Sequence, residues 1–171
     1  MKSFALLATA ALAATAIAIP VEAKAKTYAD TLRAHGVTAD FIERCRGNLQ
    51  ASYTPKTRHI RLCLDGMKKA DDVGQALRHE TIHAIQHCIA MKLEKPGLMP
   101  IADVIDYSDR KLANKLRSEV RNHVYRKYSS SLSGSNEFNG GMNPALEEEA
   151  YALQDMWSNK QTLEIFAASC G

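Results

Sequence analysis

The chain has 171 residues, of which 46% are hydrophobic, and a formal net charge of +3 at pH 7. This composition predicts a folded globular protein, and the small excess of basic residues excludes the strong positive field of a nucleic-acid-binding protein. In the 109–128 segment the basic residues are spaced along a helical pattern beside Asp109 and Glu119, which is typical of a solvated helix face.

The first 23 residues have the pattern of a secretory signal peptide. Lys2 gives a positive start, an apolar stretch runs from Phe4 to Ile19, and Val21-Glu22-Ala23 has compact residues where a signal peptidase reads. We expect cleavage after Ala23; an uncleaved anchor is the alternative. The stretch is short and Ala-rich, and no later segment approaches the roughly 20 apolar residues of a membrane span. The sequence predicts an exported protein, periplasmic or secreted, without a stable membrane anchor, in which residues 24–171 form one domain.

The domain contains an even number of cysteines. They are Cys45, Cys63, Cys88 and Cys170. Because an exported protein meets an oxidising compartment, this number favours two disulfides, with three pairings open. A cysteine metal site is the weaker alternative, since no C-x-x-C pair occurs and the spacings are wide.

The N-terminal part of the domain is expected to hold two helices and a β-ribbon. Residues 28–35 are interpreted as a first helix that ends at Gly36. Thr38-Ala39-Asp40 is interpreted as the cap of a second helix containing Phe41, Ile42 and Cys45. Residues 49–53 and 59–64 then alternate apolar and polar side chains around a Pro-containing turn, which predicts a two-stranded ribbon.

The next predicted helix carries a chemical motif. Asp71 or Asp72 caps it, and an apolar stripe at helical spacing extends it to about Met91. It contains the H-E-x-x-H motif His79-Glu80-Thr81-Ile82-His83. Residues four apart lie about 40° apart around the axis, so His79 and His83 project from one face and can bind one metal ion. Glu80 can take a proton from a metal-bound water without being a ligand.

Two residues close to this motif are poor candidates for further ligands. His79 and His87 are roughly 12 Å apart along the helix axis, whereas zinc–nitrogen distances are about 2.0 to 2.1 Å. Cys88 lies about 140° around the axis from His83. We therefore interpret His87 as a supporting or surface histidine and Cys88 as a half-cystine.

The C-terminal half is expected to be helical on both sides of one long loop. Helical stretches are predicted for residues 101–107 and 109–128. Residues 129–143 are dominated by Ser, Gly and Asn, so they form either a surface loop or a flap over the cleft. Asn143-Pro144 starts a further helix, with Asn as the cap and Pro at its first position. A last helix is expected at about 160–169, and the predicted fold class is mainly α (α+β).

A zinc ion held by two histidines needs at least one more protein ligand. The H-E-x-x-H helix preceded by a ribbon resembles the zincin peptidases, in which an edge strand lies beside the active-site cleft. In the gluzincin branch a glutamate of a Glu-Ala pair on a later helix is often that ligand, and Glu149-Ala150-Tyr151-Ala152 resembles that pattern. The resemblance implies Zn²⁺ with His79, His83 and Glu149 as ligands. Glu148 and Glu147 remain alternatives, either as ligands or as anions that complement the helix N-terminus.

A second resemblance is local. His79 to Ala84 followed by Cys88 is similar to the motif region of the mitochondrial peptidase that assists ATP-synthase assembly, which has a Ser-Glu-aliphatic-Arg motif downstream. Ser118-Glu119-Val120-Arg121 matches that motif, which makes Glu119 the main rival ligand. The chain departs from that family at Gln86, where the family has Asp.

These patterns predict an exported zinc metallopeptidase that hydrolyses a peptide or protein substrate with Glu80 as general base. The residue that stabilises the oxyanion stays open. The candidates are Tyr151, Tyr128, Tyr107, His87 and His123. One alternative is a binding protein that keeps the zincin scaffold without turnover. Others are a disulfide-stabilised interaction module without metal, and a surface helix on which His79 and His83 pair with acidic neighbours.

Overall fold

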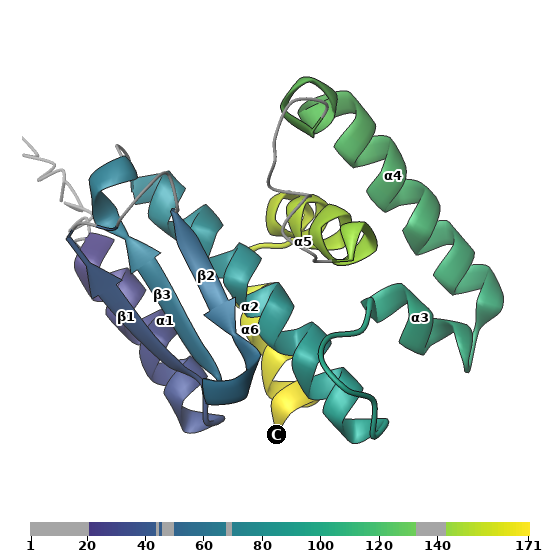
Figure 1. Cartoon of the computed structure of the whole chain (residues 1–171), viewed down its shortest axis with the longest axis horizontal. Helices are drawn as coiled ribbons and strands as arrows, with labels where there is room; N and C mark the ends of the chain where they lie inside the picture. Colours follow the sequence, from purple (N-terminus) through teal and green to yellow (C-terminus); the bar gives the residue numbers. More distant parts are fainter. Residues whose placement is uncertain (1–20, 44, 46–49, 68–69, 133–142) are drawn as a thin grey trace, which may run out of the picture.

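The computed structural model describes residues 21–43, 45, 50–67, 70–132 and 143–171 (Figure 1). The expected signal segment lies outside the described residues except for 21–23, and the expected loop lies outside them over 133–142. Helices and one small three-stranded sheet make up the described part, which confirms the mainly α (α+β) class. None of the helices in these ranges has the length and apolar character that crossing a bilayer requires.

The sheet contains the expected ribbon and one strand more. Strands β2 (Ala51–Thr54) and β3 (His59–Cys63) are antiparallel neighbours, which confirms the ribbon. The turn between them ends at Arg58, whose φ is 50°. The extra strand, β1 (Thr38–Ile42), runs parallel to β3, so that the sheet order is β1-β3-β2.

Strand β1 corrects the second predicted helix. Thr38 does not cap a helix; it is the first residue of β1, and its Cα partner across the sheet is that of His59. Val37 and Ala39 are buried whereas Thr38 and Asp40 are exposed, which is the alternation of a strand with one covered face. Pairing with β3 thus overrides the local capping signal.

The first helix has the predicted end and an earlier start. Helix α1 (Val21–Ala34) stops before Gly36, which has a φ of 75° that glycine adopts without steric cost. The expected cleavage point after Ala23 falls in its first turn. Among the residues of α1 whose burial is described, Tyr28, Ala29 and Leu32 are buried, and all lie after that point.

Helix α2 (Ala70–Lys92) is the centre of the molecule and confirms the predicted motif helix. It packs on β2 and β3 and also contacts α6 (Asn159–Cys170) and α5 (Pro144–Met156). In Figure 1 the sheet covers one side of α2, while α5 and the green α4 (Arg110–Leu132) lie on the other. The short α3 (Ile101–Asp106) connects α2 to α4. Leu77, Ile82 and Ile85 of α2 join Phe166 of α6 in the main apolar core.

Sequence signals fix the later helix boundaries. The Asn143 side chain accepts a hydrogen bond from the backbone N–H of Ala145, with Pro144 at the first helical position, as predicted. Ser158 and Gln161 form a reciprocal capping box at the start of α6. Helix α4 continues to Leu132, so the start of the expected 129–143 loop is helical instead.

Two disulfides select one of the three possible pairings. Cys45 is bonded to Cys63 and Cys88 to Cys170, which leaves none of the four cysteines free to bind metal. The first bond joins the segment after β1 to the end of β3, and the second joins α2 to the last turn of α6. Two structural disulfides fit an extracellular or periplasmic protein.

Candidate metal centre

Three side chains from two helices converge on one point. His79 and His83 lie on consecutive turns of α2, and Glu147 lies in the first turn of α5. The two Nε2 atoms are 3.2 Å apart. Glu147 Oε2 lies 3.3 Å from Nε2 of His79, and Glu147 Oε1 lies 3.2 Å from Nε2 of His83. Within the described ranges, these residues form the group of metal-ligating side chains close enough to share one ion.

The spacing of these atoms fits a tetrahedral zinc site. Ligand atoms at about 2.0 to 2.1 Å from a tetrahedral ion lie about 3.3 Å from one another. The two Nε2 atoms are 3.2 Å apart, and Glu147 offers a different oxygen to each histidine, at 3.3 and 3.2 Å. With one ligand atom from each residue, the three atoms lie within 4.8 Å of one another. Two imidazoles and one carboxylate are also a donor set that zinc accepts, and three protein ligands leave a fourth position for water or substrate.

A glutamine holds His83 by its other ring nitrogen. Gln86 Oε1 lies 2.8 Å from His83 Nδ1. The Gln86 amide NH₂ is directed at two acceptors, the Leu146 carbonyl and the Glu149 carboxylate, so its oxygen must face the histidine. His83 therefore carries its proton on Nδ1 when neutral and presents the Nε2 lone pair to the centre.

His79 is held in the same way. Gln154 Oε1 lies 3.1 Å from His79 Nδ1, and the Gln154 NH₂ donates to the Tyr128 hydroxyl. With both imidazoles neutral, two nitrogen lone pairs and a carboxylate face one another across about 3 Å. Three acceptors at this distance repel unless a cation or protons lie among them.

Glu149, the preferred third ligand in the sequence prediction, lies elsewhere. Its carboxylate is 2% exposed and accepts the backbone N–H groups of Ile101 and Ala102 at 2.7 and 2.9 Å, besides the Gln86 amide at 2.9 Å. Residues two positions apart in a helix point about 200° apart around its axis. Helix α5 therefore cannot direct Glu147 and Glu149 to the same side. The set of ligands remains a prediction, but its third member changes from Glu149 to Glu147.

The other glutamate candidates are not placed at the histidines. Glu119 pairs with Lys115 at 3.8 Å on the outer side of α4, with a side chain that is 48% exposed. Glu148 is half-buried one position after Glu147 and is absent from the group that could share an ion. Helix α5 thus supplies the carboxylate, as expected, from an earlier residue than expected.

Glu80 is enclosed next to the two histidines. It is 5% exposed, and its carboxylate accepts the backbone N–H of Tyr53 on β2. Burial raises the pKa of the Glu80 carboxyl above its ordinary value, although His79, His83 and the Tyr53 N–H oppose the rise. A raised pKa brings a carboxylate closer to the range in which it can both accept and return a proton near neutral pH.

The charges of the centre depend on one another. Burial acts to raise the pKa of Glu147, but hydrogen bonds with His79 and His83 outweigh it and hold that pKa well below its usual range. Burial acts to lower the pKa of His83, yet the hydrogen bond to Glu147 and the nearby Glu80 charge raise it overall. The group therefore favours an ionised carboxylate and a positive charge beside it.

One of the candidates for the oxyanion donor adjoins the centre. Tyr151 lies one turn after Glu147 on α5, and its ring centroid is 4.7 Å from that of His79. Tyr128 and His123 instead bind Asp155, and His87 Nδ1 is 2.8 Å from the Tyr53 hydroxyl. The remaining candidate, Tyr107, is 72% exposed at the end of α3. Tyr151 thus remains the candidate in ring contact with the centre.

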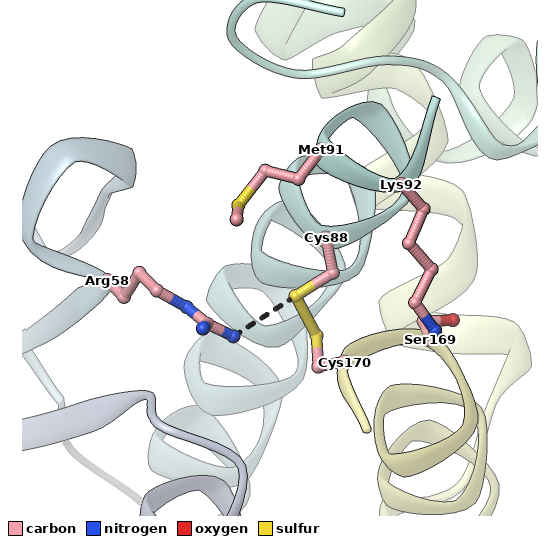
Figure 2. Close-up of a pocket in the computed structure, with 6 residues that line it drawn as sticks. All are labelled: Arg58, Cys88, Met91, Lys92, Ser169 and Cys170. Carbon is pink, nitrogen blue, oxygen red and sulfur yellow. Dashed lines mark hydrogen bonds between the residues drawn. A yellow bond between two sulfur atoms is a disulfide. The ribbon is translucent and has the colours of Figure 1, made fainter. Parts of the chain in front are cut away.

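A hollow of about 200 Å³ lies at the C-terminal end of α2 (Figure 2). The Cys88–Cys170 disulfide is part of its lining, and Arg58 donates a hydrogen bond to Cys88 Sγ at 3.4 Å. Its remaining lining residues are Met91, Lys92 and Ser169. Neither candidate histidine nor Glu147 lines it, so the hollow is separate from the metal centre.

No protein-family model, curated protein or solved structure matches this chain. The predicted resemblance to zincins therefore rests on the sequence motifs alone.

Proposed function

We propose that the protein is an exported, zinc-dependent peptidase. The observation that carries the proposal is the convergence of His79, His83 and Glu147, whose ligand atoms lie within 4.8 Å of one another, with Glu80 enclosed beside them. Ordinary salt bridges would also bring a carboxylate to two histidines. They would not require both Nδ1 atoms to be held by glutamine oxygens with both Nε2 atoms turned inward.

Each residue has a distinct task in this proposal. A bound Zn²⁺ would lower the pKa of a water molecule and polarise the carbonyl of the bond to be cleaved. His79, His83 and Glu147 would hold the ion. Glu80 accepts the proton of the attacking water and then donates it to the leaving amine. Tyr151 is the proposed donor to the oxyanion, because its ring lies against His79.

Two features support export. The N-terminal segment has the order of charge, apolar stretch and compact residues that signal peptidases recognise. The domain is closed by two disulfides, which persist in oxidising compartments.

The proposal is tested with protein beginning after Ala23. We expect about one zinc ion per chain by elemental analysis, and cleavage of a mixed library of quenched fluorescent peptides. Glu80→Gln should keep the zinc and lower the cleavage rate by about 10²- to 10⁴-fold, the usual contribution of a general base. Glu148→Gln is the matched control and should keep both.

The possible results separate the alternatives. Zinc with no cleavage of any peptide would indicate a binding protein on the same scaffold. Protein without zinc after metal reconstitution would indicate an interaction module in which protons bridge Glu147 and the histidines. Cleavage that survives Glu80→Gln would contradict the mechanism.

A further inference from the structure

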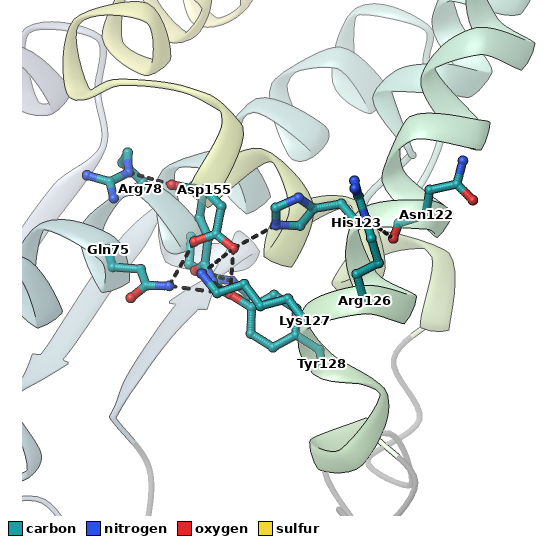
Figure 3. A network of polar contacts seen from close by, with 10 residues as sticks. Gln75, Arg78, Asn122, His123, Arg126, Lys127, Tyr128 and Asp155 are labelled. Carbon is teal, nitrogen blue, oxygen red and sulfur yellow. Dashed lines mark hydrogen bonds and ion pairs between the residues drawn. The ribbon is translucent and has the colours of Figure 1, made fainter.

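A polar network on α4 and α5 ends at His79. Asp155 lies at its centre, as Figure 3 shows, between Gln75 of α2 and residues of α4. Its carboxylate accepts from the Tyr128 hydroxyl at 2.7 Å, from Lys127 Nζ at 2.8 Å and from His123 Nε2 at 2.9 Å. Burial acts to raise the pKa of Asp155, but these hydrogen bonds lower it overall.

The direction of every hydrogen bond from Asp155 to His79 is determined. An ionised carboxylate can only accept hydrogen bonds, so the Tyr128 hydroxyl donates its single hydrogen to Asp155. The Tyr128 oxygen can then only accept from Gln154, which fixes the NH₂ of Gln154 toward the tyrosine at 3.0 Å. The amide oxygen must therefore face His79 Nδ1, at 3.1 Å.

We propose that Tyr128 and Asp155 are positioning residues that set the tautomer of His79 through Gln154. The inference rests on the proposed function, since it assigns these residues to the orientation of a metal ligand. If the polarity of the network were reversed, the Gln154 NH₂ would face Nδ1 and His79 would carry its proton on Nε2, pointing at the metal position. Outer partners of ligating histidines typically change metal affinity by about 10- to 100-fold.

Tyr128→Phe removes the hydroxyl and keeps the ring, so Gln154 loses the acceptor that holds its orientation. Zinc affinity, measured by competition with a chromophoric chelator, should fall by about tenfold or more. The matched control is Gln75→Met. Gln75 donates to both Tyr128 and Asp155 but does not lie between them and His79, so its loss should leave the affinity unchanged.

A rescue variant separates positioning from a general loss of structure. In the double variant Tyr128→Phe with Gln154→Glu, a carboxylate stands where the amide was and can accept from Nδ1 in either orientation. We expect it to recover most of the lost zinc affinity. An affinity of Tyr128→Phe equal to that of Gln75→Met, or a double variant that stays as weak as Tyr128→Phe, would overturn the inference.

The tautomer can also be measured without metal. In ¹⁵N-labelled protein free of zinc at alkaline pH, long-range ¹H–¹⁵N spectra should show His79 protonated on Nδ1, and Tyr128→Phe should lose this preference. A neutral His79 protonated on Nε2, with no proton on Nδ1, in the unsubstituted protein would contradict the inference. Because this measurement needs neither zinc nor cleavage, it stands even if the proposed peptidase function fails.

Discussion

The middle and the C-terminal end of helix α2 differ in how their side chains are held. In the middle, His79 and His83 meet Glu147 as three hydrogen-bond acceptors that need a cation or protons among them. At the end, Cys88 is joined covalently to Cys170, and Arg58 donates to its sulfur. The end is held by a covalent bond, whereas the middle would gain stability by binding a cation or protons.

The contrast distinguishes a binding site from a hollow. In the space beside the disulfide, Lys92 donates to the Ala168 carbonyl and Arg58 to Cys88 Sγ, although Arg58 Nε is buried without a partner. The metal centre is nearly closed, with His79 and Glu147 side chains 13% and 15% exposed, but its polar atoms face one another. The polar atoms that face one another, and not the hollow, indicate the chemistry.

Removal of the Cys88–Cys170 disulfide should have the largest effect on stability and little effect on metal binding. The bond closes a loop with a sequence separation of 82, so the double variant to Ser should lose roughly 4 kcal/mol of unfolding free energy. Denaturant titration measures this loss. Zinc affinity under native conditions should stay within the error of the unsubstituted protein. A large loss of affinity would show that the two ends of α2 are coupled.

Glu147→Gln should have the reverse effect, with a large loss of zinc affinity and little loss of stability. Loss of a ligand should weaken zinc binding by about 100-fold or more, which is close to 3 kcal/mol, because even outer partners cost up to about 100-fold. Chelator competition measures the affinity. Glu148→Gln is the neighbouring control. If the two variants bound zinc equally well, Glu147 would not be a ligand.

Glu149→Gln should lower the stability less than loss of the disulfide, and lower the zinc affinity less than Glu147→Gln. Its carboxylate holds the start of α3 and the Gln86 amide, and hydrogen bonds to a charged group contribute about 2 kcal/mol each. We expect about 2–3 kcal/mol lower stability by denaturant titration, with a smaller loss of zinc affinity than Glu147→Gln. A zinc affinity as low as that of Glu147→Gln would return Glu149 to the centre.

The smallest effect is expected at alkaline pH, from the contact between α1 and α2. The Tyr28 hydroxyl donates to Thr81 Oγ1, and burial raises the pKa of Tyr28 from 10.0 to about 12. Between these values the folded state keeps a proton that the unfolded state has lost, so stability falls as the pH rises. Tyr28→Phe should remove up to about 2 kcal/mol of this fall. Unfolding curves with an unchanged pH slope would contradict the assignment.

The sequence predicted best the elements that depend on local or periodic signals. The amphipathic stripe of α2, the Asn143-Pro144 start of α5 and the β2–β3 ribbon were all confirmed. The predicted helix after Thr38 was wrong, because this short segment pairs with β3, the more distant strand of the ribbon, and no local pattern records that partner. The alternation of Val37 and Ala39 was the available signal for a strand.

In the candidate site, too, the residues related by helical spacing were predicted, and those that depend on packing between helices were not. The spacing of His79 and His83 on one helix predicted that they share a face, and their Nε2 atoms meet. The choice among the three consecutive glutamates depended on how α5 is rotated against α2, which sequence spacing does not determine. The glutamines were missed altogether. Gln86, one helical turn after His83, could have been noticed as an i+3 partner, but Gln154 depends on the packing of two helices.

The position of β1 in the sheet has a consequence for the order of assembly. Parallel neighbours cannot be joined by a tight turn, and here β2 and the turn after it lie in the connection between β1 and β3. We therefore expect the hairpin to form first and β1 to dock last and open first, with faster amide hydrogen exchange than β3. The Cys45–Cys63 bond spans the end of this late pair, next to the Ile42–Cys63 register, and so secures the strand that local contacts secure least.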